Sequence, residues 1–319
     1  MGVRKALSII LIGIGVFGLV LAAGLRFYAP SRAEKTPLNL DITLVSTGPA
    51  SLLNTATGQL EQTNLIATRH VRTDSAASNS DVTVVQETLC IVKAVDNPPE
   101  CVDNQDPQQR LVSFTTDRVA ADRKSGESVN DKKYGENVNG DVNVKHVGLS
   151  YKWPFDAKKQ SYKFYDPNSG QAPDAKYTGT EKLAGLSLYK YQADITNIDL
   201  PIDPQGKIPG KYSDSRTVLV DPVTGVIVKG VEHQVRTLAD GSPAVDTTLT
   251  FNQNAINYQA KQAKDGRSKI NQLTVVFPLI ALLVGIGALV AGALLLRRSP
   301  GRRAEPPAPA ASEPPLERV

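Results

Sequence analysis

The sequence predicts an α+β fold dominated by β-strands, with an exoplasmic domain of antiparallel sheets and hairpins between an N-terminal and a C-terminal transmembrane helix. Uncharged apolar stretches at residues 6–25 and 273–296 predict the two helices. Between them, short segments either alternate apolar and polar residues or are rich in Val and Thr, as half-buried strands are. Turn-forming residues separate these segments, which favours hairpins.

The first apolar stretch is long enough to cross a membrane. Residues 6–25, at about 1.5 Å each, extend about 30 Å, the thickness of a bilayer's hydrocarbon core. A cleaved signal peptide is the alternative, because Arg4 and Lys5 precede the stretch and residues 21–23 resemble a cleavage site. The stretch exceeds the about 7–15 apolar residues typical of a signal peptide, which favours retention as an anchor.

The second stretch, 273–296, has no such alternative. Small residues recur at four-residue spacing in both stretches, at Gly18 and Ala22 and at Ala281 and Gly285, and such pairs let membrane helices pack closely. Neither stretch contains an ionisable residue. Ion pathways and proton relays need such groups within the bilayer, so a channel or transporter built from these helices alone is not expected.

Basic residues lie beyond the outer ends of both stretches: Arg4, Lys5, Arg297, Arg298, Arg302 and Arg303. Because such residues remain in the cytoplasm, we expect a two-pass protein of the cell membrane with both termini cytoplasmic and the centre exoplasmic. The expected layout is a cytoplasmic N-terminus (1–5), a helix (6–25), an exoplasmic β-rich domain (26–272) with a helical stalk near 252–270, a second helix (273–296) and a cytoplasmic, Pro-rich, disordered tail (297–319). Four basic residues before the second helix oppose this orientation unless they lie against anionic headgroups on the outer face: Lys261, Lys264, Arg267 and Lys269.

Strand patterns recur through the central domain. The expected strands are 38–46, 81–94, 111–119, 143–153, 177–195 and 245–251. The clearest hairpin is 216–237, where Asp221 and Pro222 open a turn and Gly225 closes it. Helical periodicity at 252–270 predicts the stalk, with Gly266 as a candidate break.

The two cysteines, Cys90 and Cys101, are close in sequence and flank a turn at Asn97-Pro98-Pro99. We expect a disulfide, which suits an oxidising exoplasmic space and stabilises by about 2–3 kcal/mol. Two free thiols are the alternative. The formal charge of +4 is mild and gives no sign of nucleic-acid binding.

Motifs typical of catalysis are absent from the sequence. There is no Gly-x-Ser-x-Gly elbow, no His-Glu-x-x-His pair and no phosphate-binding Gly loop, and the three histidines are scattered. We therefore expect no catalytic residues, no metal site and no cofactor.

Aromatic residues are concentrated in one part of the chain: Tyr151, Trp153, Phe155, Tyr162, Phe164, Tyr165, Tyr177, Tyr189 and Tyr191. One interpretation is the core of a β layer, since aromatics favour strands. The other is an apolar ligand groove that accepts an acyl chain, with Tyr hydroxyls at its mouth.

Four motifs, at residues 148–156, 162–166, 185–191 and 220–225, resemble the actinobacterial membrane proteins of the porin PorA family. The layout with two terminal anchors is also similar. The resemblance implies a porin of the mycolic-acid envelope and brings no catalytic residues. A pore needs a closed lipid-facing barrel or a polar-lined helix bundle, which two apolar helices and polar strands do not provide.

We therefore expect a non-catalytic membrane protein of the cell envelope with a binding or assembly role, including lipid handling. A porin or channel component and a membrane-anchored enzyme of envelope metabolism are the alternatives. The expected partners are membrane lipid, an acyl-chain or envelope-lipid ligand, and membrane proteins or a second copy of the chain, but no nucleic acid.

Overall fold

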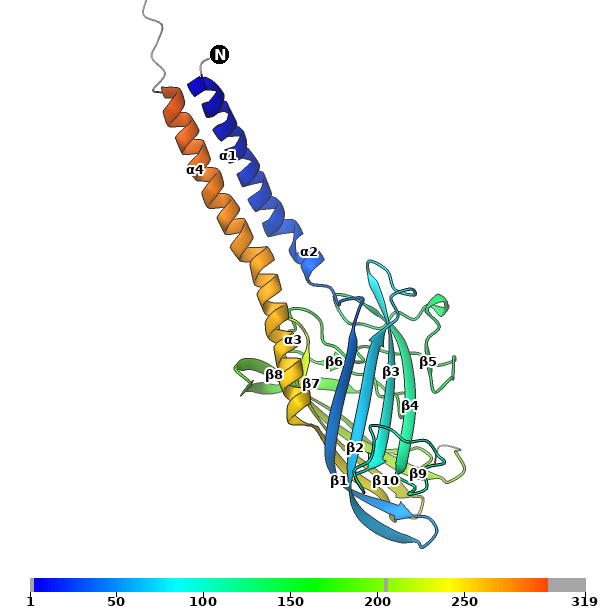
Figure 1. Cartoon of the computed structure of the whole chain (residues 1–319). Coiled ribbons are helices and arrows are strands. Elements are labelled where there is room, and N and C mark those ends of the chain that lie inside the picture. Colours follow the sequence, from blue (N-terminus) through cyan, green and yellow to red (C-terminus); the bar gives the residue numbers. More distant parts are fainter. Residues whose placement is uncertain (1–2, 204–205, 298–319) are drawn as a thin grey trace, which may run out of the picture. The chain divides into compact units, whose positions relative to one another are not determined.

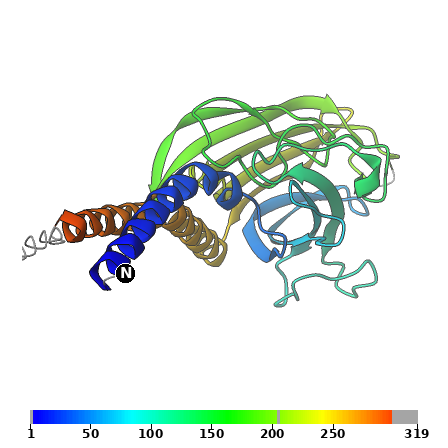
Figure 2. The same cartoon turned by 90° about the horizontal axis from the view of Figure 1, so that it is seen from above.

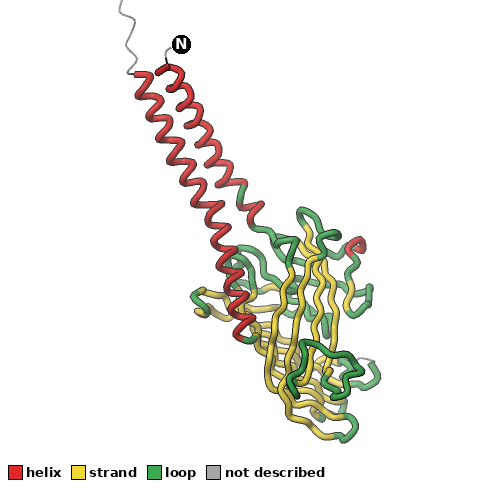
Figure 3. Tube along the Cα trace, viewed as in Figure 1, coloured by secondary structure: helices red, strands yellow, loops and turns green. Residues whose placement is uncertain are grey.

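The computed structural model describes residues 3–203 and 206–297, which form two units. The helix unit comprises residues up to Pro30 and from Gln272 onward, and the strand unit comprises Ser31–Asn271. Figure 3 colours the helices red and the strands yellow; every strand belongs to the strand unit, which also contains helix. The expected tail at 298–319 lies outside the described residues.

The helix unit contains α1 (Val3–Tyr28), a π-helical turn η2 (Gln272–Val276) and α4 (Phe277–Arg297). Both long helices are apolar enough to cross a membrane. They pack closely through glycine, because a Cβ added at Gly18 would lie 2.8 Å from the Cα of Gly285. Ser8 Oγ also donates a hydrogen bond to the carbonyl of Gly292 at 2.6 Å. The small-residue spacing thus serves contact between α1 and α4.

The strand unit is built on an eleven-stranded antiparallel sheet of order β5-β4-β3-β2-β1-β11-β10-β9-β8-β7-β6. The strands are β1 (Asp41–Asn54), β2 (Gln59–Thr73), β3 (Val82–Lys93), β4 (Leu111–Asp122), β5 (Asn137–Val138), β6 (Tyr162–Lys163), β7 (Asp174–Leu183), β8 (Leu186–Asp199), β9 (Gly210–Val220), β10 (Ile227–Leu238) and β11 (Pro243–Phe251). The helices that accompany them are α2 (Pro30–Ala33), η1 (Lys132–Tyr134) and α3 (Gln253–Asn271) (Figure 1).

Every neighbouring pair in this sheet is adjacent in sequence except β1 and β11, which pair with Ser46 opposite Phe251 and Leu52 opposite Val245. This pairing joins a first meander, β1–β5, to a second, β6–β11. Figure 2 shows the blue and cyan strands of the first meander curving to face the green and yellow strands of the second.

Backbone hydrogen bonds through loops connect the two outer edges of the curved sheet. Ser128 N donates to Gly148 O at 2.9 Å, and Leu149 N donates to Lys163 O at 2.8 Å. Gly148 has a φ of 76°, and a Cβ there would lie 2.4 Å from the Lys163 carbonyl oxygen, so only glycine fits this position. The sheet consequently encloses an interior.

Helix α3 packs on the second meander through residues at helical spacing, Ile256, Ala260 and Ala263. This confirms the predicted helix near 252–270. Gly266 does not break it, since α3 continues to Asn271. A Cβ at Gly266 would lie 2.8 Å from Thr224 Cγ2, so the glycine allows close approach instead.

Three strand predictions differ from the structure. Segment 143–153 forms only isolated bridges, because Gly148 turns the chain before a regular ladder can form. Segment 177–195 is two strands, β7 and β8, joined by a turn at Ala184 and Gly185, both with positive φ. Strand β2 was not predicted, because its first half is rich in Gln, Glu and Asn, residues that are uncommon in strands.

Cys90 and Cys101 form a disulfide with a Cα–Cα distance of 5.7 Å, as predicted, and neither is a free thiol. The bridge links buried Cys90 of β3 to the loop before β4.

We predict that the double substitution Cys90→Ser and Cys101→Ser lowers the free energy of unfolding by about 3 kcal/mol, because the unfolded chain loses a closed loop. Thermal unfolding of the full-length protein measures the loss. Mass spectrometry without reductant should find the two cysteine peptides linked, and two unlinked thiol peptides would contradict the assignment.

Candidate functional site

A cavity of about 1100 Å³ lies inside the strand unit, between the curved sheet and α3. Alternate strand residues line it, since successive side chains in a strand point to opposite faces. The apolar wall includes Ile42, Leu44, Leu65, Ala67, Val71, Val85, Ile91, Val245 and Leu249. The same alternation leaves Thr43 and Thr47 of β1 exposed on the outer face.

Three arginines interrupt this apolar wall, Arg69, Arg216 and Arg236. Arg69 follows Leu65 and Ala67 at the next inward position of β2, and its Nη1 contacts Glu87 Oε1 of β3 at 2.5 Å. A charge at an inward position costs much free energy unless it is paired and hydrogen-bonded. The Arg69–Glu87 pair supplies that partner across neighbouring strands.

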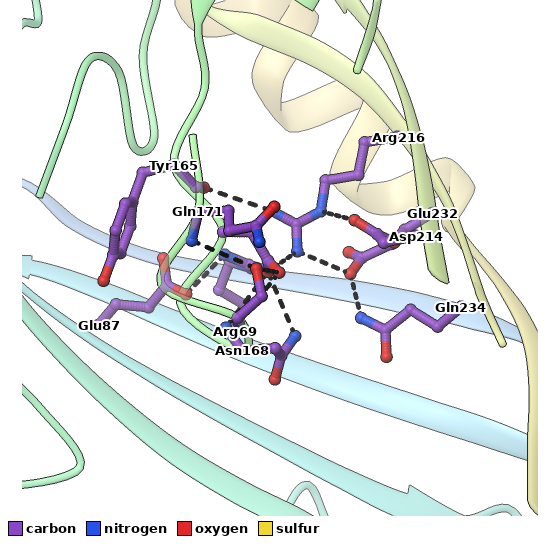
Figure 4. Close-up of polar contacts among 11 residues, drawn as sticks. Arg69, Glu87, Tyr165, Asn168, Gln171, Asp214, Arg216, Glu232 and Gln234 are labelled. Carbon is purple, nitrogen blue, oxygen red and sulfur yellow. Dashed lines mark hydrogen bonds and ion pairs between the residues drawn. The ribbon is translucent and has the colours of Figure 1, made fainter. Parts of the chain in front are cut away.

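Arg216 of β9 is the centre of a larger network of charges (Figure 4). Its Nη2 lies 2.5 Å from Asp166 Oδ1 and 3.1 Å from Glu232 Oε1, and its Nε lies 2.9 Å from Asp214 Oδ2. Gln234 donates a hydrogen bond to Glu232, and Arg216 Nη1 donates one to the carbonyl of Tyr165 at 3.4 Å. One guanidinium thus contacts three carboxyl groups from three segments.

Carboxylates outnumber arginines in this wall, and burial shifts the pKa values of the carboxyl groups. Burial raises the pKa of Glu87 against the effect of Arg69. Burial also raises the pKa of Asp214 to about 8, opposed by Arg216 and assisted by Glu232. For Asp166, burial is outweighed by Arg216 and by hydrogen bonds from Ser169, so its pKa is lowered. Arg216 therefore holds Asp166 ionised, whereas Asp214 retains a proton near neutral pH.

A second cluster of polar side chains lies where loops connect the two outer edges of the sheet. His146 is fully buried, and its Nε2 lies 2.7 Å from Asp117 Oδ1. Glu136 Oε1 lies 3.5 Å from the other ring nitrogen, and the ring of Tyr165 lies 4.6 Å from that of His146. Within residues 3–203 and 206–297, no group of three or more His, Cys, Asp or Glu side chains is arranged to hold a metal ion.

The structure separates the nine aromatics of the predicted groove into two environments. Tyr151, Phe155, Phe164 and Tyr165 line the cavity. Trp153, Tyr162, Phe164, Tyr177, Tyr189 and Tyr191 pack in one core cluster, in which the rings of Trp153 and Tyr191 are 5.2 Å apart. Aliphatic strand residues contribute more to the cavity wall than these aromatics do.

Sequence reasoning missed the charged residues of the wall. Their signal is a charge on the inward face of an alternating strand, as in Leu65-x-Ala67-x-Arg69-x-Val71 of β2. Alternation alone does not show which charges meet, because Arg216, Asp166 and Glu232 are brought together only by the strand register.

Comparisons with known proteins indicate a family. A family model described as "Porin PorA" matches residues 7–294. The chain is 22% identical over 298 residues to "Porin PorA" of Corynebacterium amycolatum, covering 73% of this chain and 75% of that protein. It is 29% identical over 108 residues to "Porin PorA" of Corynebacterium resistens, covering 31% of this chain and 26% of that protein.

We predict that Arg216→Met lowers the free energy of unfolding by about 3–5 kcal/mol, because buried Asp166 and Asp214 and half-buried Glu232 lose their cation. The loss should shrink as the pH falls from 8 towards 5, since protonation of these carboxylates removes their repulsion. Chemical unfolding of the full-length protein, followed by fluorescence of Trp153, the single tryptophan, measures both effects.

Lys211→Met is the matched control, because Lys211 pairs with Asp199 on the surface at 2.6 Å. Such an exposed pair contributes at most about 1 kcal/mol. Equal losses in the two variants, or a loss at Arg216 that is independent of pH, would contradict the central role of Arg216.

Proposed function

Because the chain belongs to the Porin PorA family, we propose that it is a membrane-anchored protein of the cell envelope that binds an amphiphile, with the apolar chain of the ligand inside the strand unit. The cavity of about 1100 Å³ carries this proposal. Its volume is at or just above the range of about 300–1,000 Å³ that is usual for small-molecule sites. Its wall is mainly aliphatic, and transfer of an acyl chain from water to such a wall is favourable.

The charges in the wall support binding rather than catalysis. Arg216 is engaged by three carboxylates and Arg69 by Glu87, so these groups are committed to one another. These pairs join neighbouring segments within each meander and place polar atoms in the cavity wall. We propose that the protein carries or presents its ligand without changing it.

A porin component is the second candidate. The name "Porin PorA" of both relatives supports this candidate more directly than it supports amphiphile binding. A conducting pathway needs a continuous polar passage, whereas the cavity wall is mostly apolar. The two candidates therefore predict different results in the labelling and conductance measurements described below.

We further propose that both termini are cytoplasmic and the strand unit is exoplasmic, from the basic residues outside the two helices. A cysteine at exposed Ala56, in the turn between β1 and β2, should react with a membrane-impermeant maleimide in intact cells. A cysteine at Ser312, beyond the described residues, should react only after lysis. The native cysteines are joined and do not interfere. The reverse pattern would refute this orientation.

For the cavity, we predict that Ser46→Trp weakens saturable labelling by a photoreactive fatty acid, because Ser46 of β1 lines the cavity and an indole would occupy part of it. Thr47→Trp is the matched control, since this neighbouring side chain is exposed on the opposite face. Labelling of the full-length protein in nanodiscs, with crosslinks mapped by mass spectrometry, measures the effect.

The same pair of variants tests the porin candidate in planar bilayers. Discrete conductance steps that are reduced by Ser46→Trp and unaffected by Thr47→Trp would favour a pore through the strand unit. Saturable lipid labelling without conductance would favour binding. Labelling that is equal in both variants and maps outside the cavity would refute the proposed site.

A further inference from the structure

Lys152 is a cation in the cavity wall whose contacts are with neutral groups. Its Nζ donates hydrogen bonds to the carbonyls of Trp153 at 3.0 Å and Thr224 at 2.9 Å. The same nitrogen lies 3.6 Å from the centre of the Phe155 ring. Among the described residues, no ion pair includes Lys152. Burial lowers its pKa to about 7, with Asp122 and Asp221 opposing the shift.

The two carboxylates that influence Lys152, Asp122 and Asp221, accept hydrogen bonds or form ion pairs with other groups. Asp122 Oδ1 accepts hydrogen bonds from the backbone of Lys124 at 2.9 Å and of Ser125 at 2.7 Å. Asp221 forms an ion pair with Arg267 and accepts a hydrogen bond from Thr224 Oγ1 at 2.6 Å. The amine of Lys152 therefore has no anion of its own, and an anion that bound there would favour its charged form.

Lys152 lies at the end of the cavity where the chain enters and leaves the strand unit. Thr36 N donates to Arg123 O at 2.8 Å, and a Cβ at Gly126 would lie 2.8 Å from the carbonyl oxygen of Lys152. On the other side, Thr224 contacts α3 at Gly266. Thr36 and Gly266 are both within six residues of the ends of the strand unit, Ser31 and Asn271.

This end of the cavity contains further cationic side chains. Lys35 and Lys269 line it beside Lys152. Lys35 pairs with Asp81 at 2.7 Å, and Asp265, the carboxylate of α3 in this wall, pairs with Lys261 at 2.6 Å. Asp81 and Asp265 are thus already paired with lysines, which leaves Lys152 and Lys269 in this wall for an added negative charge.

Resting on the function proposed above, we propose that the amphiphile is anionic and that its acidic headgroup, a carboxylate or a phosphate, forms an ion pair with Lys152 while its apolar chain lies along the aliphatic strands. The headgroup would supply the partner that the fold does not provide. The guanidinium of Arg216, which already pairs with three carboxyl groups, would compete less for it.

The test compares two photoreactive probes that have the same chain and end in either a carboxylate or an alcohol. The full-length protein in phosphatidylcholine nanodiscs should bind the acid more tightly than the alcohol. Lys152→Met should weaken binding of the acid about tenfold, the usual effect of losing a charged hydrogen bond, and leave the alcohol unchanged. Lys152→Arg should retain the preference for the acid.

Lys163→Met is the matched control, since Lys163 is an exposed lysine paired with Asp174 at 3.1 Å and does not line the cavity. Its ratio of acid to alcohol affinity should equal that of the unaltered protein. If Lys152 only pins the carbonyls of Trp153 and Thr224, Lys152→Met would weaken both probes equally, which would overturn the proposal.

Competition on the unaltered protein keeps the test independent of folding in the variant. Displacement of the acid probe by palmitate supports an anionic ligand with a carboxylate headgroup. Displacement by lysophosphatidic acid as well shows that a phosphate headgroup also binds. Equal affinity for acid and alcohol would overturn the anionic headgroup but leave the cavity as a binding site. Failure of both probes to bind saturably would instead overturn the proposed function.

Discussion

The pairing of β1 with β11 is the contact on which the strand unit depends. It joins two meanders that are far apart in sequence, with Ser46 opposite Phe251. Without it, each meander would expose a long unpaired strand edge and an apolar face. Because the pairing lies at the centre of the sheet order, the curved sheet can bring its outer edges, β5 and β6, towards the loops that connect them. The cavity follows from that curvature rather than from any single lining residue.

Placing charges inside such an apolar wall costs free energy, and the fold offsets this cost by pairing the charges across segments. Arg216 on β9 contacts Asp166 from the loop after β6 and Glu232 on β10. Replacing a buried network with apolar residues is often neutral or stabilising, so stability alone does not account for it. Arg216 and Glu232 lie directly opposite each other on β9 and β10, and a shift of one residue in this register would move one of them to the opposite face. The network thus favours one register of the curved sheet.

The sequence predicted the elements that depend on local periodicity. The hairpin with its turn at Gly225, helix α3 and the disulfide all follow from residues close in sequence. The structure departs from prediction where tertiary contacts decide, as at Gly148, which turns a strand-like segment into a closing loop. The aromatics illustrate the same limit, because composition located Trp153 and Tyr151 but did not show that one enters the core and the other the cavity. Arg69 and Lys152 were missed because an inward charge becomes visible only when the register is known.

Segment 148–156, which carries part of the family resemblance, has three structural roles within a few residues. Gly148 allows the backbone contact that closes the sheet, and Leu149 and Trp153 enter the core. Tyr151 and Lys152, between them, line the cavity. An irregular backbone makes this possible, since a regular strand would direct only alternate side chains to one face. The same turn that closes the sheet therefore places a cation against the apolar wall, so the position of Lys152 is coupled to the closure of the fold.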